Sequence, residues 1–185
     1  MVGWRNSGAR EVGPLLEWLA PDAELTSVLE LNKPLLDRLG ATAVIFDLDN
    51  TLVAYGHSEP SEAVKAQLRY LAGLGIGFIL LSNALAGRAA DLAAKLGMPY
   101  IGQANKPSAD GFRRACAMLN RRPAETAVVG DQLFRDILGA RRAGCSAVLV
   151  HPLSTRDFPG TALLRPLEAV TIAFLKRQLS WPRCS

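Results

Sequence analysis

The sequence predicts an α/β fold, a doubly wound parallel sheet flanked by helices, and three observations lead to this prediction. First, four short apolar runs recur along the chain, and none of them alternates apolar with polar residues. Strands buried on both faces, as in parallel sheets, have this pattern. Second, stretches with helical character lie between these runs, so that strands and helices alternate. Third, Gly97 and Gly144 end two of the helical stretches shortly before the next strand.

The expected elements follow in chain order. Strands are predicted at residues 42–46, 76–81, 126–129 and 146–150, with one more short strand at Tyr100 and Ile101. Helices are predicted at 61–72, 85–96, 107–119 and 133–142. Right-handed crossovers between parallel strands then place the helices against the sheet.

The terminal segments are less regular. Residues 1–40 carry Pro14, Pro21 and Pro34 and are expected to form a helical extension packed on a core of residues 41–185. Near the C-terminus one helical stripe is expected to pack onto the domain. Its residues are Leu167, Val170, Thr171, Phe174 and Leu175.

Composition excludes several classes of protein. A chain of 185 residues with 49% apolar and 21% charged residues is an ordinary single globular domain. No apolar stretch approaches the roughly 18 residues of a membrane span, and Met1 is followed by a polar stretch without an apolar signal region. The three cysteines are scattered and are read as structural or incidental, which favours a reducing compartment. A cytoplasmic location is therefore expected.

Charge is divided unevenly along the chain. Residues 1–100 hold 8 basic and 11 acidic side chains, a net charge of −3, whereas residues 101–185 hold 13 and 6, a net charge of +7. A basic half suits an anionic partner, such as a phosphorylated substrate, an acidic membrane surface or RNA. Solvated helix faces are the alternative, and for any single arginine pair they are the preferred interpretation.

Polar residues follow three of the predicted strands. Asp47 ends the first strand, Ser82 ends the second, and Gly130 and Asp131 end the third. Parallel sheets bind ligands beyond the carboxyl ends of their strands, so these side chains are expected to meet at one crevice. A carboxylate at the end of a buried strand is costly unless a charge such as a divalent cation compensates it.

The pair Asp47 and Asp49 predicts acid–base and nucleophilic chemistry. Carboxylates at positions i and i+2 on the exit of a strand can reach one pocket, where one attacks phosphorus and the other transfers protons. The alternative is a capped loop in which Asp49 and Asn50 bond to the backbone.

Ser82, Asn83 and Lys106 are candidate phosphate-binding residues. Ser82 and Asn83 precede a helix, where a hydroxyl and backbone N–H groups can hold phosphoryl oxygens. Lys106 precedes Pro107 at the expected start of another helix and can neutralise a transferring phosphoryl group. An ordinary helix cap at Ser82 and a solvated Lys106 are the alternatives.

Asp131 and Asp136 add acidic groups behind the third strand. Asp131 is expected to bind Mg²⁺ directly through a carboxylate oxygen. Asp136 is expected to contact the metal only indirectly, through a direct ligand or a water molecule. The alternative for Asp136 is a salt bridge with Arg135 or Arg141.

Together these motifs resemble the haloacid dehalogenase superfamily of aspartate-nucleophile phosphatases. The segments Asp47–Val53, Leu81–Asn83, Lys106–Pro107 and Gly130–Gly139 are most similar to its YqeG-type branch, subfamily IIIA. That branch is related to the mitochondrial phosphatidylglycerophosphate phosphatases. The resemblance covers nearly the whole chain.

The resemblance implies a role for each residue. Asp47 would be the nucleophile and a Mg²⁺ ligand, and Asp49 the general acid/base that lends its backbone carbonyl to the metal. Ser82 and Lys106 would hold the phosphoryl group, and Asp131 would complete the metal site. Two departures concern only substrate contacts: Arg135 stands where the branch usually has Thr, and Ala140-Arg141 where Gly-Asn is common.

No cap domain is expected. The gaps between Leu52 and Ser61 and between Pro99 and Lys106 are too short for a folded unit. An open crevice suits a large substrate, such as a phosphatidylglycerophosphate-like lipid or a phosphorylated macromolecule. A small phosphorylated metabolite is an alternative substrate. The sequence predicts no oligomeric state.

Two other classes compete with a phosphatase. One is a non-catalytic binding protein that docks on RNA or a ribosomal partner through its basic half, although a scaffold needs none of the acidic groups. The other is a phosphate-accepting receiver domain, which does not need a second acid at i+2.

Peripheral contact with an anionic membrane is a further hypothesis. Trp4, Trp18 and Trp181 all lie in the terminal segments, and tryptophan favours the membrane interface. The alternative is that they cover the edges of the sheet and anchor the termini.

Overall fold

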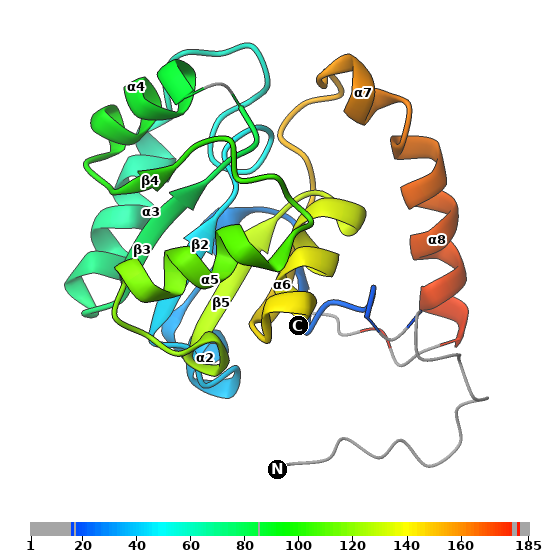
Figure 1. Cartoon of the computed structure of the whole chain (residues 1–185), viewed down its shortest axis with the longest axis horizontal. Helices are drawn as coiled ribbons and strands as arrows, with labels where there is room; N and C mark the ends of the chain where they lie inside the picture. The colour runs from blue at the N-terminus through cyan, green and yellow to red at the C-terminus, as the bar shows by residue number, and fades with distance from the viewer. Residues whose placement is uncertain (1–15, 17, 85, 179–180, 182–185) are drawn as a thin grey trace.

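The computed structural model describes residues 16, 18–84, 86–178 and 181, and Figure 1 shows its arrangement. One sheet of six parallel strands runs in the order β1-β6-β5-β2-β3-β4. The strands are β1 (Ala23–Leu25), β2 (Ala43–Phe46), β3 (Gly77–Leu81), β4 (Tyr100–Ile101), β5 (Thr126–Gly130) and β6 (Ser146–Val150). The α-helices are α2 (Lys33–Arg38), α3 (Glu62–Gly73), α4 (Ala86–Leu96), α5 (Ala109–Met118), α6 (Leu138–Ala143), α7 (Pro159–Ala162) and α8 (Arg165–Gln178). The shorter helical turns are η1 (Val28–Glu30), η2 (Pro123–Glu125) and η3 (Leu133–Ile137).

The predicted α/β architecture with a parallel sheet is confirmed. Alternate strand residues face opposite layers, so both faces are apolar: Val44 and Phe46 of β2 pack on one side and Ile45 on the other. Helices α3 and α4 cover the first face, and α5 and α6 cover the second, where Figure 1 shows them in front of the strands. The strand order changes direction at β2, which places the crevice of a doubly wound sheet beside the carboxyl ends of β2 and β5.

Two helix boundaries differ from the prediction. Helix α5 begins at Ala109 and not at Pro107, because Ser108 is its N-cap and accepts a hydrogen bond from the Asp110 N–H at 3.3 Å. The predicted helix 133–142 divides into the π-helical turn η3 and the helix α6. The wider turn brings Asp136 against the end of β5.

The N-terminal part differs as well. Residues 23–25, expected to be helical, form the edge strand β1, which pairs with β6. Its backbone is reinforced by Asp22, which accepts hydrogen bonds from the Ala147 N–H and from Arg141. Residues 1–15 lie outside the described residues, so the proposed division at residue 40 stays a prediction.

The expected packing of the C-terminal stripe is wrong for most of its residues. Leu175 is buried, whereas Leu167, Val170 and Phe174 are exposed. Helix α8 stands beside the sheet in Figure 1 and not against it, and its inner side meets the core through Leu175 and Glu168. The outer side therefore has no covering among the described residues.

The structure describes two of the three tryptophans and two of the three cysteines. Trp4 and Cys184 lie outside the described residues. Trp18 is exposed, and the Trp181 indole donates a hydrogen bond to Glu24 at 2.7 Å, which fits the anchoring alternative for that residue. Cys116 and Cys145, far apart in sequence, are buried with their sulfurs 3.8 Å apart.

The connections at the crevice carry no folded cap. The residues between Val53 and Ser61 form only turns and bends, and the described residues from Gly102 to Ser108 form neither helix nor strand. No described helix has both the length and the apolar character needed to cross a membrane.

Candidate active site

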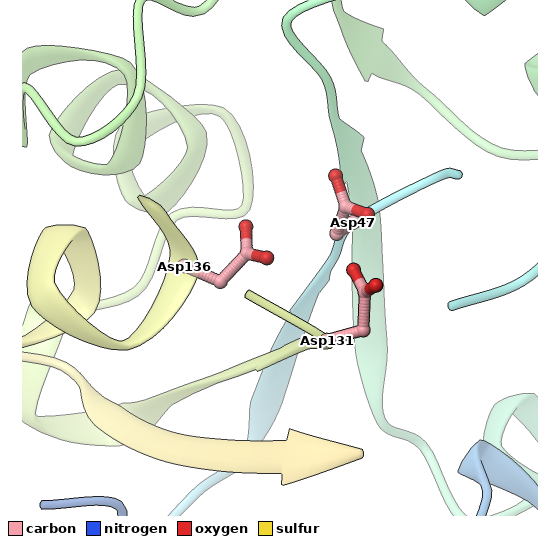
Figure 2. A group of neighbouring side chains, drawn as sticks. All are labelled: Asp47, Asp131 and Asp136. Atoms are coloured by element: carbon pink, nitrogen blue, oxygen red, sulfur yellow. The ribbon is translucent and has the colours of Figure 1, made fainter. Parts of the chain in front are cut away.

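Three acidic side chains from two strand ends and one helical turn meet at the crevice. Asp47 follows β2, Asp131 follows β5, and Asp136 lies in η3. Figure 2 shows their carboxylates turned toward one shared space, and one oxygen of each lies within 4.8 Å of the others. All three residues are buried. The convergence predicted from the strand ends is present for Asp47 and Asp131. Ser82 is not part of this cluster, and Asp136, expected only as an indirect ligand, lies within it.

Asp47 is positioned by the sheet. Its backbone N–H donates to the Val129 carbonyl at 2.9 Å, which extends the pairing of β2 and β5 beyond the last residue of β2. One carboxylate oxygen forms an ion pair with Lys106. The other, Oδ2, has no hydrogen-bond partner although it is buried. Burial raises the pKa of Asp47 to about 7, with Lys106 opposing this rise and Asp136 adding to it.

Lys106 lies between two carboxylates. Its Nζ donates to Asp136 Oδ1 at 2.6 Å and also to Asp47. Burial lowers the pKa of this amine, but Asp136 and Asp47 raise it more, so its pKa lies above the ordinary value. Lys106 therefore stays charged in the crevice, and the solvated alternative is wrong.

Asn83 fixes the backbone of Lys106. Its amide oxygen accepts a hydrogen bond from the Lys106 N–H at 2.8 Å, and its amide nitrogen donates to the Lys106 carbonyl at 3.1 Å. Ser82 is buried next to it, and its Oγ accepts a hydrogen bond from the Ala84 N–H at 3.0 Å. The phosphate contacts expected of these two residues stay predictions, and it is Asn83 that holds the Lys106 backbone.

Asp136 is held in place from two directions. Oδ1 accepts from Lys106, and Oδ2 accepts from the Gln132 N–H at 3.1 Å. A Cβ at Gly130 would lie 2.3 Å from the Asp136 Cγ, so only glycine lets this carboxylate approach the end of β5. The alternative salt bridge with Arg135 or Arg141 is wrong: Arg135 donates to Thr161, and Arg141 binds Asp22 and Ala20.

Asp131 is paired with a cation that the sequence prediction did not include. Arg165, at the start of α8, forms an ion pair with the Asp131 carboxylate and donates to its backbone carbonyl at 2.9 Å. Thr51 lies 3.5 Å from the same carboxylate. Burial, with Asp47 nearby, raises the pKa of Asp131 well above its usual range despite Arg165.

Asp49 lies apart from the three clustered carboxylates and has its own partner. Its Oδ1 accepts from Arg88 at 2.7 Å, and both side chains are partly exposed at the mouth of the crevice. Arg88, in the first turn of α4, was likewise not predicted. Neither arginine stands in a motif, and only its position in the fold identifies it.

Asn50 connects the Asp47 loop to the segment after β6. It has a left-handed backbone conformation with φ of 63°. Its side chain donates to the Arg156 carbonyl at 2.8 Å and to Asp157 at 3.0 Å, and it accepts from the Tyr55 N–H at 3.1 Å. The capped-loop alternative thus holds for Asn50, whereas Asp49 points to Arg88.

The donor set fits a small divalent cation that prefers oxygen. Three buried carboxylates face the cations Lys106 and Arg165, and the Asp47 Oδ2 oxygen still lacks a partner. Carboxylate oxygens are the ligands that Mg²⁺ binds, and no cysteine or histidine belongs to the cluster.

Comparison with protein families places residues 57–144 in a group described as haloacid dehalogenase-like hydrolases. The matched segment contains Lys106, Asp131 and Asp136 and begins after Asp47 and Asp49.

Similar proteins extend this comparison to the rest of the chain. The probable phosphatase YqeG of Bacillus subtilis (strain 168) is 29% identical over 164 residues, which cover 89% of this chain and 95% of the relative. The phosphatidylglycerophosphate phosphatase 1 of Arabidopsis thaliana, chloroplastic/mitochondrial, is 26% identical over 172 residues, covering 88% of this chain. This chain spans 49% of the length of that relative.

A solved structure has the same fold. The crystal structure of an uncharacterized protein from Listeria monocytogenes serotype 4b superposes with a TM-score of 0.51 at 21% identity, covering 63% of this chain and 84% of the other.

Proposed function

We propose that the chain is a phosphatase of the haloacid dehalogenase-like type that hydrolyses phosphomonoesters through an aspartyl-phosphate intermediate. The match of residues 57–144 to the haloacid dehalogenase-like hydrolases and the similarity to the probable phosphatase YqeG support this proposal. The observation that carries the proposal is the Asp47 carboxylate, which is buried, ion-paired with Lys106 on one side and without a partner on the other. An oxygen that is held in place but unpaired is available to attack.

Two half-reactions follow from this arrangement. An Asp47 oxygen attacks phosphorus while the bond to the alcohol oxygen breaks, and the protonated Asp49 gives its proton to the leaving alcohol. Water then attacks the aspartyl phosphate, Asp49 takes the proton of the water, and inorganic phosphate and the Asp47 carboxylate are released. Arg88, 2.7 Å from Asp49, orients this acid at the mouth of the crevice.

Lys106 and the metal ligands complete the proposed site. Lys106, Ser82 and Asn83 would bind the phosphoryl group, and Asn83 and Asp136 also keep Lys106 in position. Asp47, Asp131 and the Asp49 carbonyl would hold Mg²⁺, with Asp136 outside them. When bound, Mg²⁺ would neutralise the charge that develops on the transferring phosphoryl group.

The proposed substrate is a phosphatidylglycerophosphate-like lipid. The connections at the crevice carry no cap, so the bulk of the substrate must exclude water from the reaction. The Arabidopsis thaliana relative bears the name of a phosphatase for that lipid. A small metabolite or a phosphoprotein would use the same chemistry. We place the protein in the cytoplasm, in peripheral contact with anionic membrane.

A substrate screen tests the proposal. The purified protein is assayed for phosphate release with p-nitrophenyl phosphate, lipid phosphates, sugar phosphates, nucleotides and a phosphopeptide, in Mg²⁺ and in EDTA. Turnover should require Mg²⁺ and should be lost in Asp47→Asn, while the matched variant Asp91→Asn on the outside of α4 keeps it. Wild-type turnover by Asp47→Asn would overturn the mechanism.

A further inference from the structure

The outer side of helix α8 is an apolar surface. The exposed side chains Leu167, Val170 and Phe174 are spaced at i, i+3 and i+7 in this helix, so they form one stripe, and the exposed Leu163 lies in the turn just before it. Leu163 is 82% exposed and Val170 is 68% exposed. From Leu163 to Phe174 every described exposed residue is apolar. We call this stripe the α8 face. Contiguous apolar surface on a folded domain marks a contact site for a partner or a membrane.

Acidic and basic side chains differ in exposure around the α8 face. Both acidic residues of the segment 151–178, Asp157 and Glu168, turn inward to Arg165, and their side chains are 7% and 6% exposed. The exposed charged side chains are Arg156 before the stripe and Lys176 and Arg177 after it. Lys176 contacts Glu24 at 2.8 Å and keeps 42% of its side chain exposed. In the sequence, the apolar stripe therefore lies between exposed residues that are all positively charged.

The α8 face also borders the candidate active site. Arg165 reaches inward from the same helix to Asp131, and Asp157 bonds to Asn50 in the loop that carries Asp49. Phe158, which is exposed, lies between this contact and α7. A surface bound to the α8 face would therefore lie beside the mouth of the crevice.

We propose that the α8 face docks the enzyme on an anionic lipid surface, with acyl-chain contacts along the stripe and lipid phosphates at its basic ends. This inference rests on the proposed function for its choice of a lipid-borne substrate. A second copy of the chain fits less well, because the exposed charges that flank the stripe in the sequence are all positive and would repel those of the other copy. Anionic lipid supplies the opposite charge.

Vesicle co-sedimentation tests the proposal on the full chain. The wild type should sediment with phosphatidylglycerol–phosphatidylcholine vesicles at low salt and less at high salt, and weakly with phosphatidylcholine alone. The double variant Leu167→Glu/Val170→Glu should bind about tenfold less. Met118→Glu, at an exposed apolar position of α5, is the matched control and should bind as the wild type does. Circular dichroism checks that each variant is folded.

Several outcomes overturn the docking proposal. These are a wild type that does not sediment at low salt, equal binding to phosphatidylcholine alone, and unchanged binding of the double variant. A wild-type dimer that Leu167→Glu/Val170→Glu dissociates would identify a second copy as the occupant. Asp47→Asn should still bind vesicles, so absent turnover with intact binding counts against the proposed chemistry and not against the α8 face.

Discussion

At the scale of single residues, the environment of the Asp47 carboxylate changes its proton affinity. Burial raises its pKa from 3.8 to about 7, even though Lys106 is in direct contact. Below pH 3.8 both the folded and the unfolded protein hold this proton. Between these two values only the folded protein holds it, so the stability that this group contributes is lost as the pH rises through about 7.

The first prediction follows from this loss of stability with rising pH. In EDTA the side chain of Asp47→Asn does not titrate, so its melting temperature relative to the wild type should rise between about pH 4 and pH 8. Thermal unfolding of both proteins by circular dichroism measures the difference. A difference that stays constant with pH would contradict the raised pKa. The exposed-site variant Glu62→Gln serves as a control. The pKa of that carboxylate is lowered from 4.5, so the melting temperature of this variant relative to the wild type should stay constant between about pH 5 and pH 8.

Asn83 gives the second prediction. Because both hydrogen bonds of its amide go to the backbone of Lys106, Asn83→Ala should lower kcat/KM roughly 10- to 100-fold through displacement of that lysine. The double variant Asn83→Ala/Lys106→Ala should be no slower than Lys106→Ala. Steady-state kinetics on the four proteins form the cycle. Additive losses would mean that Asn83 acts on the substrate independently of Lys106.

At the scale of elements, the contact between α5 and α6 depends on one glycine. A Cβ at Gly139 would lie 2.3 Å from the Phe112 ring, which is fully buried under the sheet. The close approach of the two helices fixes η3, and η3 carries Asp136. Helix packing and the position of a site residue are therefore coupled here.

The third prediction is that Gly139→Ala destabilises the protein by about 1–3 kcal/mol through overpacking. Urea unfolding measures the change, and Phe112→Leu should restore part of it by making room. Gly73→Ala, at the end of α3, is the matched control and should not destabilise, because a Cβ added there would meet no neighbouring atom within 4 Å. Equal stability of Gly139→Ala and the wild type would refute the steric argument.

At the scale of the whole molecule, Arg165 connects the C-terminal helix to the centre of the sheet. Its guanidinium contacts Asp131, Asp157 and Glu168. Burial lowers the pKa of Arg165, but Asp131 and Asp157 raise it more. It thus neutralises a carboxylate that is also a proposed Mg²⁺ ligand. Cation binding at Asp131 must compete with this arginine.

The fourth prediction concerns that competition. Arg165→Gln should bind Mg²⁺ more tightly than the wild type, because a positive charge beside Asp131 is removed. Isothermal titration calorimetry measures the affinity without any need for turnover. Lys176→Gln on the same helix, which contacts Glu24 and not the crevice, should leave the affinity unchanged. Weaker binding by Arg165→Gln would show that the arginine supports the cation site.

The extent to which sequence predicts this molecule depends on the range of each interaction. The strands β2, β3, β5 and β6 were predictable within a residue or so, because a buried parallel strand is a local apolar run. The convergence of Asp47 and Asp131 followed from topology.

Ion pairs between distant positions were not predictable. Arg88 is 39 residues from Asp49, and Arg165 is 34 from Asp131, so no spacing pattern relates them. The exposure of the α8 face was missed for a similar reason: helical periodicity shows that a stripe is apolar but not which surface covers it.

Helix α8 faces two environments, and this arrangement has a thermodynamic consequence. Its inner side supplies Arg165 to Asp131, and its outer side is the α8 face. Two ligands that act on opposite sides of one rigid helix obey reciprocal linkage. If anionic vesicles change the affinity of the protein for Mg²⁺ by a given factor, Mg²⁺ must change the affinity of the protein for vesicles by the same factor. A factor different from one would make the lipid bilayer an allosteric effector of the metal centre as well as the source of its substrate.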